Sequence, residues 1–250
     1  MNPPNTTHPQ TETPAYRSVA TKIERMLTSD ELTPGDPLPN ETDLATKFGV
    51  SRSTIRESLR LLEDTGYVHR VSPRKLVAAI PDAKHLATRT ARALYANRVT
   101  VREVWEMILA LEPAMAFHAA KRASDDEIAA LRTNVDETML AHERGEDLSQ
   151  LDLAFHSKLG EASHHKAMQI VLEPYKALFM PMVDGLVHRL DMQPRLITAH
   201  QRVVEAIERR DSKVAELWMQ RHQLDFERGC RFADIELNRP FDIETLARMQ

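Results

Sequence analysis

Four side chains in the second half of the sequence are of the types that bind divalent metal ions. Asp152 and His156 lie four residues apart, so on a helix one carboxylate oxygen and one imidazole converge on a single point. His200 and His222 lie in two further predicted helices, and with them the set suits zinc, nickel or manganese. The chain holds 11 histidines, however, and capping or surface positions explain these residues as well as a metal does. Spacing alone therefore marks a candidate site and leaves its occupant open.

A second group of side chains, nearer the N-terminus, has the chemistry needed to contact DNA. Arg52 and Arg56 are four residues apart and share one face of a predicted helix, and a guanidinium group can bind O6 and N7 of guanine with two hydrogen bonds. Three short hydroxyl side chains suited to phosphate or base contacts accompany them: Ser51, Ser53 and Thr54. Ordinary surface arginines on an amphipathic helix explain this spacing equally well.

The elements that must position this second group lie between residues 15 and 80. Apolar residues at helical spacing predict three helices, over 15–27, 41–48 and 51–64. Gly49 is expected to end the second helix and Ser51 to cap the third, which leaves a tight turn between them. This order of elements is typical of a helix-turn-helix.

A hairpin with a basic tip is expected to follow the third helix. Tyr67–Val71 and Lys75–Ile80 can pair as two short strands around the turn Ser72-Pro73-Arg74. Such a hairpin forms the wing of a winged helix-turn-helix, and Arg74 and Lys75 are its candidate DNA contacts.

Residues 81–250 are expected to be almost entirely helical, because they hold four glycines and no lasting strand-like alternation. The expected helices cover about 82–97, 101–122, 125–144, 148–163, 166–189, 194–210 and 211–232, with a short one near Glu244. Pro174 and Pro181 should kink or split the fifth of these. An apolar stripe is expected in the core of the bundle, formed by Trp105, Ile108, Leu109 and Met115.

Composition restricts the class of protein. The chain is 42% hydrophobic and 28% charged, without an apolar run near the roughly 20 residues of a membrane span. Its first 14 residues lack the basic start and apolar middle of a signal peptide, so we expect a cytoplasmic protein with no membrane partner. A net charge of −4 requires any DNA-binding face to be local. The single cysteine, Cys230, cannot form an internal disulfide and is expected to be a packing residue.

Five segments are expected along the chain, and the fold class is mostly α. They are a disordered tail (1–14), a winged helix-turn-helix DNA-binding domain (15–80), a linker with the start of the first bundle helix (81–88), an antiparallel all-helical domain for metal binding, ligand binding and dimerisation (89–235), and a C-terminal tail (236–250).

Two stretches of the predicted DNA-binding domain resemble the N-terminal domain of GntR-superfamily regulators. They are LTPGDPLPNETDLA from Leu32 to Ala45 and GVSRSTIRESLRLLE from Gly49 to Glu63. The likeness covers nearly the whole predicted domain and implies that Arg52 and Arg56 contact operator DNA. Thr42 stands where that family often has a further DNA-contacting arginine, and the wing tip lacks the family's frequent glycine. The resemblance therefore implies DNA binding but not a particular operator sequence.

The C-terminal half resembles the ligand-sensing FCD domain of the FadR-like branch of that superfamily. The similar stretches are Leu111–Pro113, Asp152–Leu159, and the region from His200 through Asp211 to His222. The resemblance implies that a divalent metal is held by Asp152, His156, His200 and His222, with a small carboxylate effector beside it in an internal cavity. Ile108 stands where the family often has an arginine near the bound acid, so the effector loses a charge partner in this chain.

These features predict a homodimeric transcription regulator, expected to be a repressor, that binds a double-stranded operator of inverted repeats. The chain is not expected to be an enzyme. The main alternative is a metal-dependent hydrolase-like helical domain fused to a DNA-binding module, because a metal with an open position can activate water. No neighbouring general base is evident for that chemistry. A constitutive architectural DNA binder is a third possibility, which would leave the large acidic C-terminal domain without a purpose.

Overall fold

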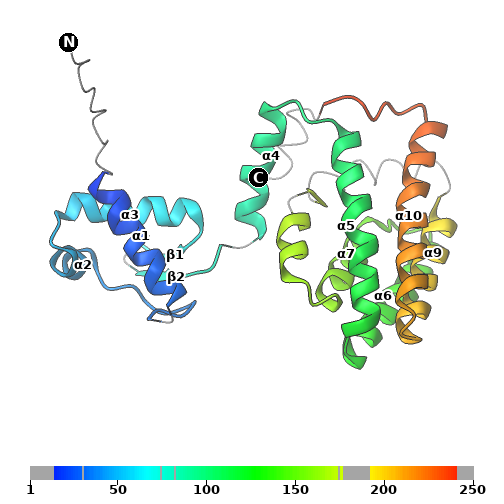
Figure 1. The fold of residues 1–250 in the computed structure, drawn as a ribbon, viewed down its shortest axis with the longest axis horizontal. Helices are drawn as coiled ribbons and strands as arrows, with labels where there is room; N and C mark the ends of the chain where they lie inside the picture. The colour runs from blue at the N-terminus through cyan, green and yellow to red at the C-terminus, as the bar shows by residue number, and fades with distance from the viewer. Residues whose placement is uncertain are drawn as a thin grey trace, which may run out of the picture. The chain divides into compact units, whose positions relative to one another are not determined.

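The chain forms two compact units, Met1–His85 and Leu86–Gln250, called here the N-terminal unit and the C-terminal unit (Figure 1). The computed structural model describes residues 14–29, 31–73, 75–81, 83–173, 175–176 and 192–240. Several predictions fall outside these residues: Arg74, Pro174, Pro181, the helix near Glu244 and most of each tail.

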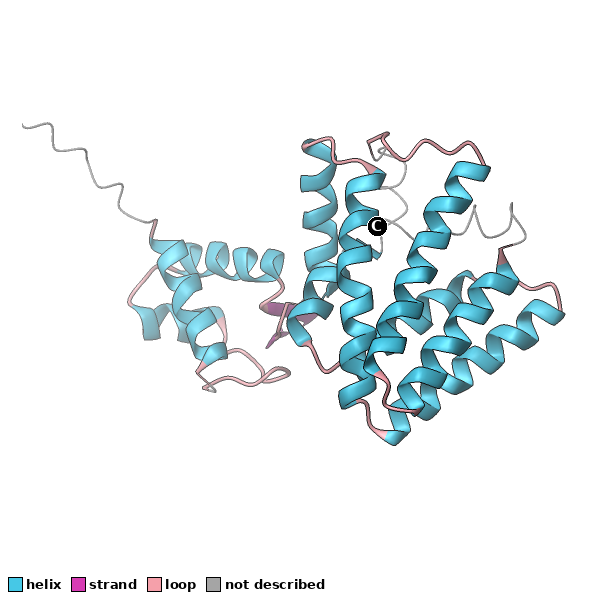
Figure 2. Ribbon diagram, turned by 45° about the vertical axis from the view of Figure 1, so that its right-hand side comes forward, coloured by secondary structure: helices cyan, strands magenta, loops and turns pink. Residues whose placement is uncertain are grey.

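The N-terminal unit contains three helices and one hairpin. The helices are α1 (Ala15–Thr28), α2 (Glu41–Phe48) and α3 (Arg52–Thr65), and the strands are β1 (Val68–Ser72) and β2 (Lys75–Ala78). The strands pair antiparallel, with an irregular register between Arg70 and Ser72. Figure 2 shows these strands as the small magenta element beside the three helices. The predicted winged helix-turn-helix is therefore confirmed.

Local side-chain chemistry sets the turn between α2 and α3. The Asn40 side chain accepts hydrogen bonds from the backbone N–H groups of Thr42 and Asp43, which caps the start of α2. Gly49 ends α2 in the left-handed conformation, at φ 64°. The Ser51 hydroxyl then accepts from the N–H of Thr54 and caps α3. Gly49 and Ser51 thus set the turn that joins the two helices.

The core of the N-terminal unit fixes α3 against α1 and leaves the other face of α3 to solvent. Its buried residues are Val19, Ala20, Ile23, Leu44, Ile55, Leu59, Leu62 and Val68. Ser58 is fully buried on α3, and its hydroxyl donates to the backbone oxygen of Tyr16 at 2.8 Å. Because the apolar stripe of α3 faces inward, Arg52 and Arg56 remain exposed.

The C-terminal unit is a helical bundle. Its helices are α5 (Val101–Arg122), α6 (Asp125–Glu143), α7 (Ser149–Ala162), α9 (Gln193–Glu208) and α10 (Ser212–Phe232). Helix α4 (Ala83–Ala96) starts at the end of the N-terminal unit and continues into the C-terminal unit. Residues 166–173 and 175–176 are also helical. α10 lies against α5 and α9, and α7 lies against α5 and α6 (Figures 1 and 2). The predicted ends of the helices named here agree with these bounds to within two residues, and the mostly α fold class is confirmed. The end predicted at residue 189 lies outside the described residues.

The apolar stripe predicted on α5 is part of the bundle core. Trp105, Ile108 and Met115 are buried, and Leu109 packs against the same cluster. The Trp105 indole N–H donates to the backbone oxygen of Gln223 on α10 at 3.0 Å, which ties the two helices together. Cys230 is buried in this cluster, and burial raises the pKa of its thiol to about 11, so its predicted role as a packing residue is confirmed. Within the described ranges, no helix is long and apolar enough to cross a membrane.

We expect Gly49→Ala to destabilise the N-terminal unit by about 1 kcal/mol, because an L-residue with a side chain resists the left-handed conformation. A Cβ atom added at Gly49 meets nothing within 4 Å, so any loss of stability comes from the backbone conformation and not from a steric clash. Hydrogen exchange in peptides covering α2 and α3 of the full chain should accelerate about fivefold, the equivalent of this energy. Gly145→Ala is the matched control, because Gly145 also has a positive φ (68°) and open space around it but lies in the C-terminal unit. Unchanged exchange in the α2 and α3 peptides of Gly49→Ala would contradict this account of the turn.

Candidate nucleic-acid interface and candidate metal centre

The outer face of α3 presents two guanidinium groups that share one carboxylate. Arg56 Nε lies 2.7 Å from Glu41 Oε2, and Arg52 Nη2 lies 3.6 Å from the same oxygen. Glu41 is the first residue of α2, so the helix-turn-helix geometry itself gathers both arginines on one surface. Their side chains are 60% and 59% exposed. Ion pairs this exposed contribute about 0–1 kcal/mol, so DNA phosphates or bases can replace the carboxylate at little cost.

The three predicted hydroxyl contacts cluster at the start of α3. Ser51 Oγ lies 2.7 Å from Ser53 Oγ and 2.9 Å from Thr54 Oγ1. The N-terminus of a helix carries unpaired N–H groups and a positive dipole end, which favour a phosphate. The structure therefore brings the hydroxyls and both arginines to the first two turns of α3.

The wing contains an arginine that sequence reasoning did not identify. Arg70 donates through Nε and Nη2 to the two carboxylate oxygens of Glu63, at 3.0 and 3.1 Å, and through Nη1 to the backbone oxygen of Pro73 at 3.3 Å. These bonds fix the tip of the hairpin to the end of α3. Lys75 is exposed at the start of β2, whereas Arg74 lies outside the described residues. A motif search could not reveal the pair, because the hairpin fold brings Arg70 back to Glu63.

The four predicted metal ligands come together inside the C-terminal unit. Asp152 and His156 lie on α7, His200 on α9 and His222 on α10, and one ligand atom from each lies within 4.8 Å of the other three. His200 Nε2 is 3.5 Å and His156 Nε2 is 3.7 Å from Asp152 Oδ1. His222 Nε2 is 3.2 Å from His156 Nε2. Three helices that are separate in sequence thus aim one carboxylate and three imidazoles at a common point.

Several atoms of this cluster are buried without a hydrogen-bond partner. Asp152, His156 and His200 are 4%, 7% and 1% exposed, and His222 is half-buried. Within the described part of the chain, neither Asp152 Oδ1 nor His200 Nε2 has a hydrogen-bond partner. Leaving a buried polar atom unpaired costs about 1–3 kcal/mol, and more for a charged one. A divalent cation placed among these atoms would satisfy them, so the donor set fits a metal ion.

The local charges favour the ligating forms of most of these side chains. Burial disfavours the charged form of Asp152, but the imidazoles around it outweigh burial and hold the pKa of its carboxyl well below the usual value. Burial lowers the pKa of His200 far below its ordinary value and, together with His156, that of His222 to about 4. At neutral pH Asp152 is therefore ionised, and His200 and His222 are neutral.

His156 is held by a second carboxylate, Glu112, which was not among the predicted site residues. Glu112 is 2% exposed, and its Oε2 lies 2.9 Å from His156 Nδ1 and also accepts a short hydrogen bond from Gln223 Nε2. Burial opposes ionisation of His156, but Glu112 and Asp152 outweigh it and raise the pKa of the imidazole to about 10. A carboxylate on Nδ1 turns Nε2 toward the cluster, which is the usual arrangement around a metal-bound histidine. The sequence did hold a signal, since Glu112 interrupts the buried apolar stripe one turn after Ile108.

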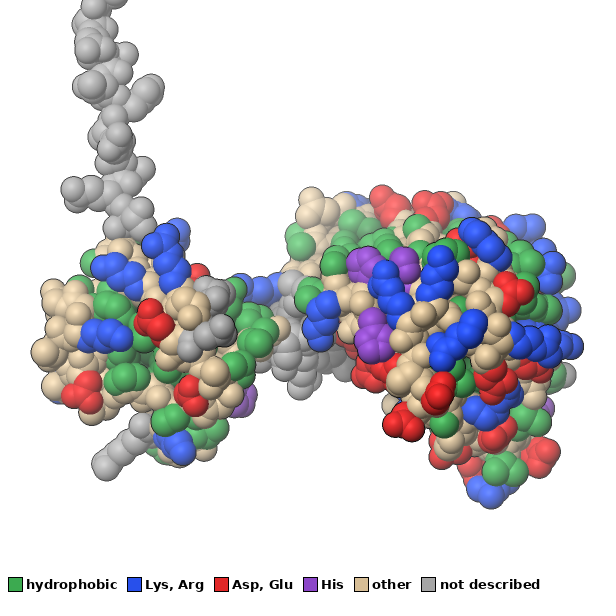
Figure 3. Space-filling view, turned by 60° about the horizontal axis from the view of Figure 1, so that its bottom comes forward, with side chains coloured by type: hydrophobic (Ala, Val, Ile, Leu, Met, Phe, Trp, Pro, Cys, Tyr) green, Lys and Arg blue, Asp and Glu red, His purple; other side chains and the backbone are tan. Residues whose placement is uncertain are grey.

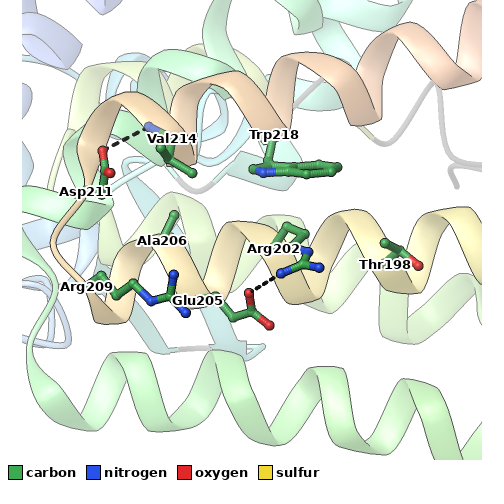
Figure 4. Close-up of a pocket in the computed structure, with 8 residues that line it drawn as sticks. All are labelled: Thr198, Arg202, Glu205, Ala206, Arg209, Asp211, Val214 and Trp218. Atoms are coloured by element: carbon green, nitrogen blue, oxygen red, sulfur yellow. Dashed lines mark hydrogen bonds and ion pairs between the residues drawn. The ribbon is translucent and has the colours of Figure 1, made fainter.

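A surface pocket of the C-terminal unit shares no lining residue with this cluster. It has a volume of about 290 Å³ and is formed by α9 and α10 (Figure 4). Its lining residues are Thr198, Arg202, Glu205, Ala206, Arg209, Asp211, Val214 and Trp218. Arg202 pairs with Glu205 at 2.9 Å, and Asp211 caps α10 through the N–H of Val214. The cavity expected beside the four ligands is therefore not this pocket and stays a prediction.

On the face shown in Figure 3, the C-terminal unit carries both acidic and basic side chains, so no single charge sign covers it. Such a surface is typical of a solvated domain rather than one that binds the phosphate backbone of DNA. This agrees with the expectation from the net charge of −4 that a DNA-binding face is local.

Comparison with known families and proteins shows likeness along most of the chain. The family model described as "Bacterial regulatory proteins, gntR family" matches residues 15–74, and the FCD domain model matches residues 103–225. The chain is 28% identical over 240 residues to the Glc operon transcriptional activator of Escherichia coli K12, covering 90% of this chain and 91% of that protein. It is 24% identical over 202 residues to the galactonate operon transcriptional repressor of the same organism, covering 78% and 87%.

A solved structure, Streptococcus agalactiae GntR, has a similar fold. It aligns with a TM-score of 0.66 at 24% identity and covers 85% of this chain and 99% of that one. The matched domains and relatives are DNA-binding transcription regulators, which are not enzymes, so the hydrolase alternative loses its support. The chain belongs to the GntR family of bacterial regulatory proteins and is a transcription regulator with a C-terminal FCD domain.

Proposed function

We propose that this regulator is a homodimeric repressor whose affinity for its operator is controlled by a small carboxylate bound beside a divalent metal ion in the FCD domain. The observation that carries this proposal is the buried set of Asp152, His156, His200 and His222, with ligand atoms within 4.8 Å of one another and two of them unpartnered. Zinc, nickel and manganese suit three imidazoles and one carboxylate. When bound, such an ion supplies positive charge and an open position for an anionic oxygen.

The chain's own residues set up this control. Asp152 and the three imidazoles hold the ion, and Glu112 positions His156 through Nδ1. The ligands come from α7, α9 and α10, so binding at this point stabilises one arrangement of three helices. A difference of about 1–3 kcal/mol between arrangements is enough to couple the site to DNA binding. A relative that is 24% identical to this chain is named as the repressor of the galactonate operon, and galactonate is a carboxylate.

The DNA proposal rests on the arginine pair of α3. We expect Arg52→Ala and Arg56→Ala each to weaken specific DNA binding by about 1–3 kcal/mol, because each removes a side chain able to make a bidentate contact with guanine. Binding of the purified variants to a duplex obtained by selection with the parent, at fixed salt, measures the effect. Arg195→Ala, the same change at an exposed position on α9, is the control and should bind as the parent does. Parent-like affinity in both α3 variants would remove these residues from the interface.

The metal proposal predicts loss of the ion in specific variants. His200→Ala and Asp152→Asn should lose bound metal, and Glu112→Gln should bind it about 10–100-fold more weakly because His156 is no longer positioned. Metal content by elemental analysis, together with melting temperature with and without chelator, measures both effects, since an ion bound only by the folded state raises stability. His142→Ala, which removes a histidine bonded to Gln193 outside the cluster, should keep the ion. Full metal content in His200→Ala would contradict the assignment.

The dimer proposal concerns the form that binds DNA. One winged domain reads a short site, so pairing of two chains should give an operator with two inverted half-sites. Light scattering at micromolar concentration should give twice the mass of the 28.5 kDa chain for the free protein, and that mass plus the mass of the duplex for the complex with a full operator. Mutating one half-site should weaken binding strongly, whereas changing the spacer composition at constant length should not. A monomer in both states would contradict the proposal.

A further inference from the structure

A buried lysine lies next to the metal cluster and has no role in holding the ion. Lys176 is 5% exposed, and its ammonium group donates to the backbone oxygen of His156 at 3.0 Å. The nearest carboxylate oxygen in the described residues is Glu173 Oε2, at 3.9 Å, on a side chain that is 41% exposed. An ammonium carries three N–H donors, and one of them is used by this hydrogen bond. Lysine is almost never this buried without a compensating anion.

Lys176 also lies close to α7 at Gly160. A Cβ atom added at Gly160 would lie 4.0 Å from Lys176 Nζ, an ordinary van der Waals distance. Gly160 lies one turn after His156, so the Lys176 ammonium group lies beside the part of α7 that carries this ligand residue. Lys176 also acts on Glu112: burial raises the pKa of that carboxyl, but His156 first and Lys176 next bring it below its usual value. The ammonium is therefore part of the electrostatics of the buried cluster.

The charges of the cluster do not balance once a divalent ion is present. Asp152 and Glu112 supply two negative charges, and the ion neutralises them when the three imidazoles are in their neutral, ligating forms. Among the described residues, the charge of Lys176 then has no counter-charge nearer than Glu173. Glu173 compensates it only weakly, because the contact is long and the carboxylate is exposed to water. A buried positive charge of this kind favours one singly charged anion beside it.

We propose that Lys176 is an effector-binding residue, whose ammonium holds the carboxylate of a monoanionic ligand that also reaches the metal. This inference rests on the proposed metal site and defines its ligand further, as a monocarboxylate. A doubly charged ligand such as phosphate would leave a negative charge buried in the same place. Charge-assisted hydrogen bonds from an ammonium to a carboxylate are among the stronger ones in proteins.

Cobalt(II) gives this inference a readout that is independent of DNA binding. The full-length protein is loaded with Co²⁺, and acetate is added while the visible absorption of the ion is recorded, with chloride at equal ionic strength as the blank. We expect acetate to change the spectrum of the parent. Lys176→Met should take up the same amount of Co²⁺ with the same acetate-free spectrum, but bind acetate at least about tenfold more weakly. Lys176→Arg, which keeps the charge, should recover part of the affinity, and Lys166→Met, a change at an exposed lysine of the same helical segment, should behave as the parent.

The possible outcomes distinguish the effector-binding role of Lys176 from the proposed metal site on which it rests. A parent that takes up Co²⁺ but does not respond to acetate, or a Lys176→Met variant with parental acetate affinity, overturns the role of Lys176 and leaves the metal site standing. A parent that takes up no Co²⁺ overturns both. If Lys176→Met does not fold, Lys176→Gln, which keeps a polar side chain without the charge, is judged by the same criterion.

Discussion

Burial of a carboxylate among three imidazoles is the constraint around which the C-terminal unit is built. Asp152 and His200 are almost completely removed from water, and both retain unpartnered polar atoms in the described part of the chain. Such a cluster is unfavourable unless a positive charge completes it, because burial penalises every unpaired polar group. The helices α7, α9 and α10 must therefore keep their positions for the cluster to exist, and α5 adds Glu112 to orient one of its imidazoles.

The two sites of this protein use opposite electrostatic regimes. Arg52 and Arg56 are exposed and share Glu41, so their free-state interactions are weak and easily exchanged for DNA. The FCD cluster is mostly buried, so each added charge there changes the free energy of the domain strongly. Ile108 lies in the apolar core and offers no cation to an anionic ligand, whereas Lys176 reaches the cluster from another helical segment. Weak ion pairs that exchange easily are suited to reversible DNA binding. Strong buried electrostatic interactions are suited to the ligand-controlled site proposed above.

Local chemistry explains which parts of this structure could be predicted from the sequence. The ends of α2 and α3 follow from Asn40, Gly49 and Ser51, which act within a few residues of themselves. The i, i+4 spacing of Asp152 and His156 and two histidines in further predicted helices marked the four clustered side chains as candidates, and a family resemblance implied that they form one ligand set. Glu112, Arg70 and Lys176 were missed because their partners lie across the fold, at His156, Glu63 and the His156 backbone. Spacing within one helix carries no information about such contacts.

X-ray absorption at the edge of the bound metal tests the central claim most directly. The protein is loaded with one equivalent of zinc. The extended X-ray absorption fine structure then reports which elements bind the ion, at distances of about 2.0–2.2 Å for nitrogen and oxygen ligands. The account predicts nitrogen and oxygen ligands only, with the multiple-scattering signature of three imidazoles. A sulfur shell from Cys230, or a spectrum without imidazole scattering, would contradict it.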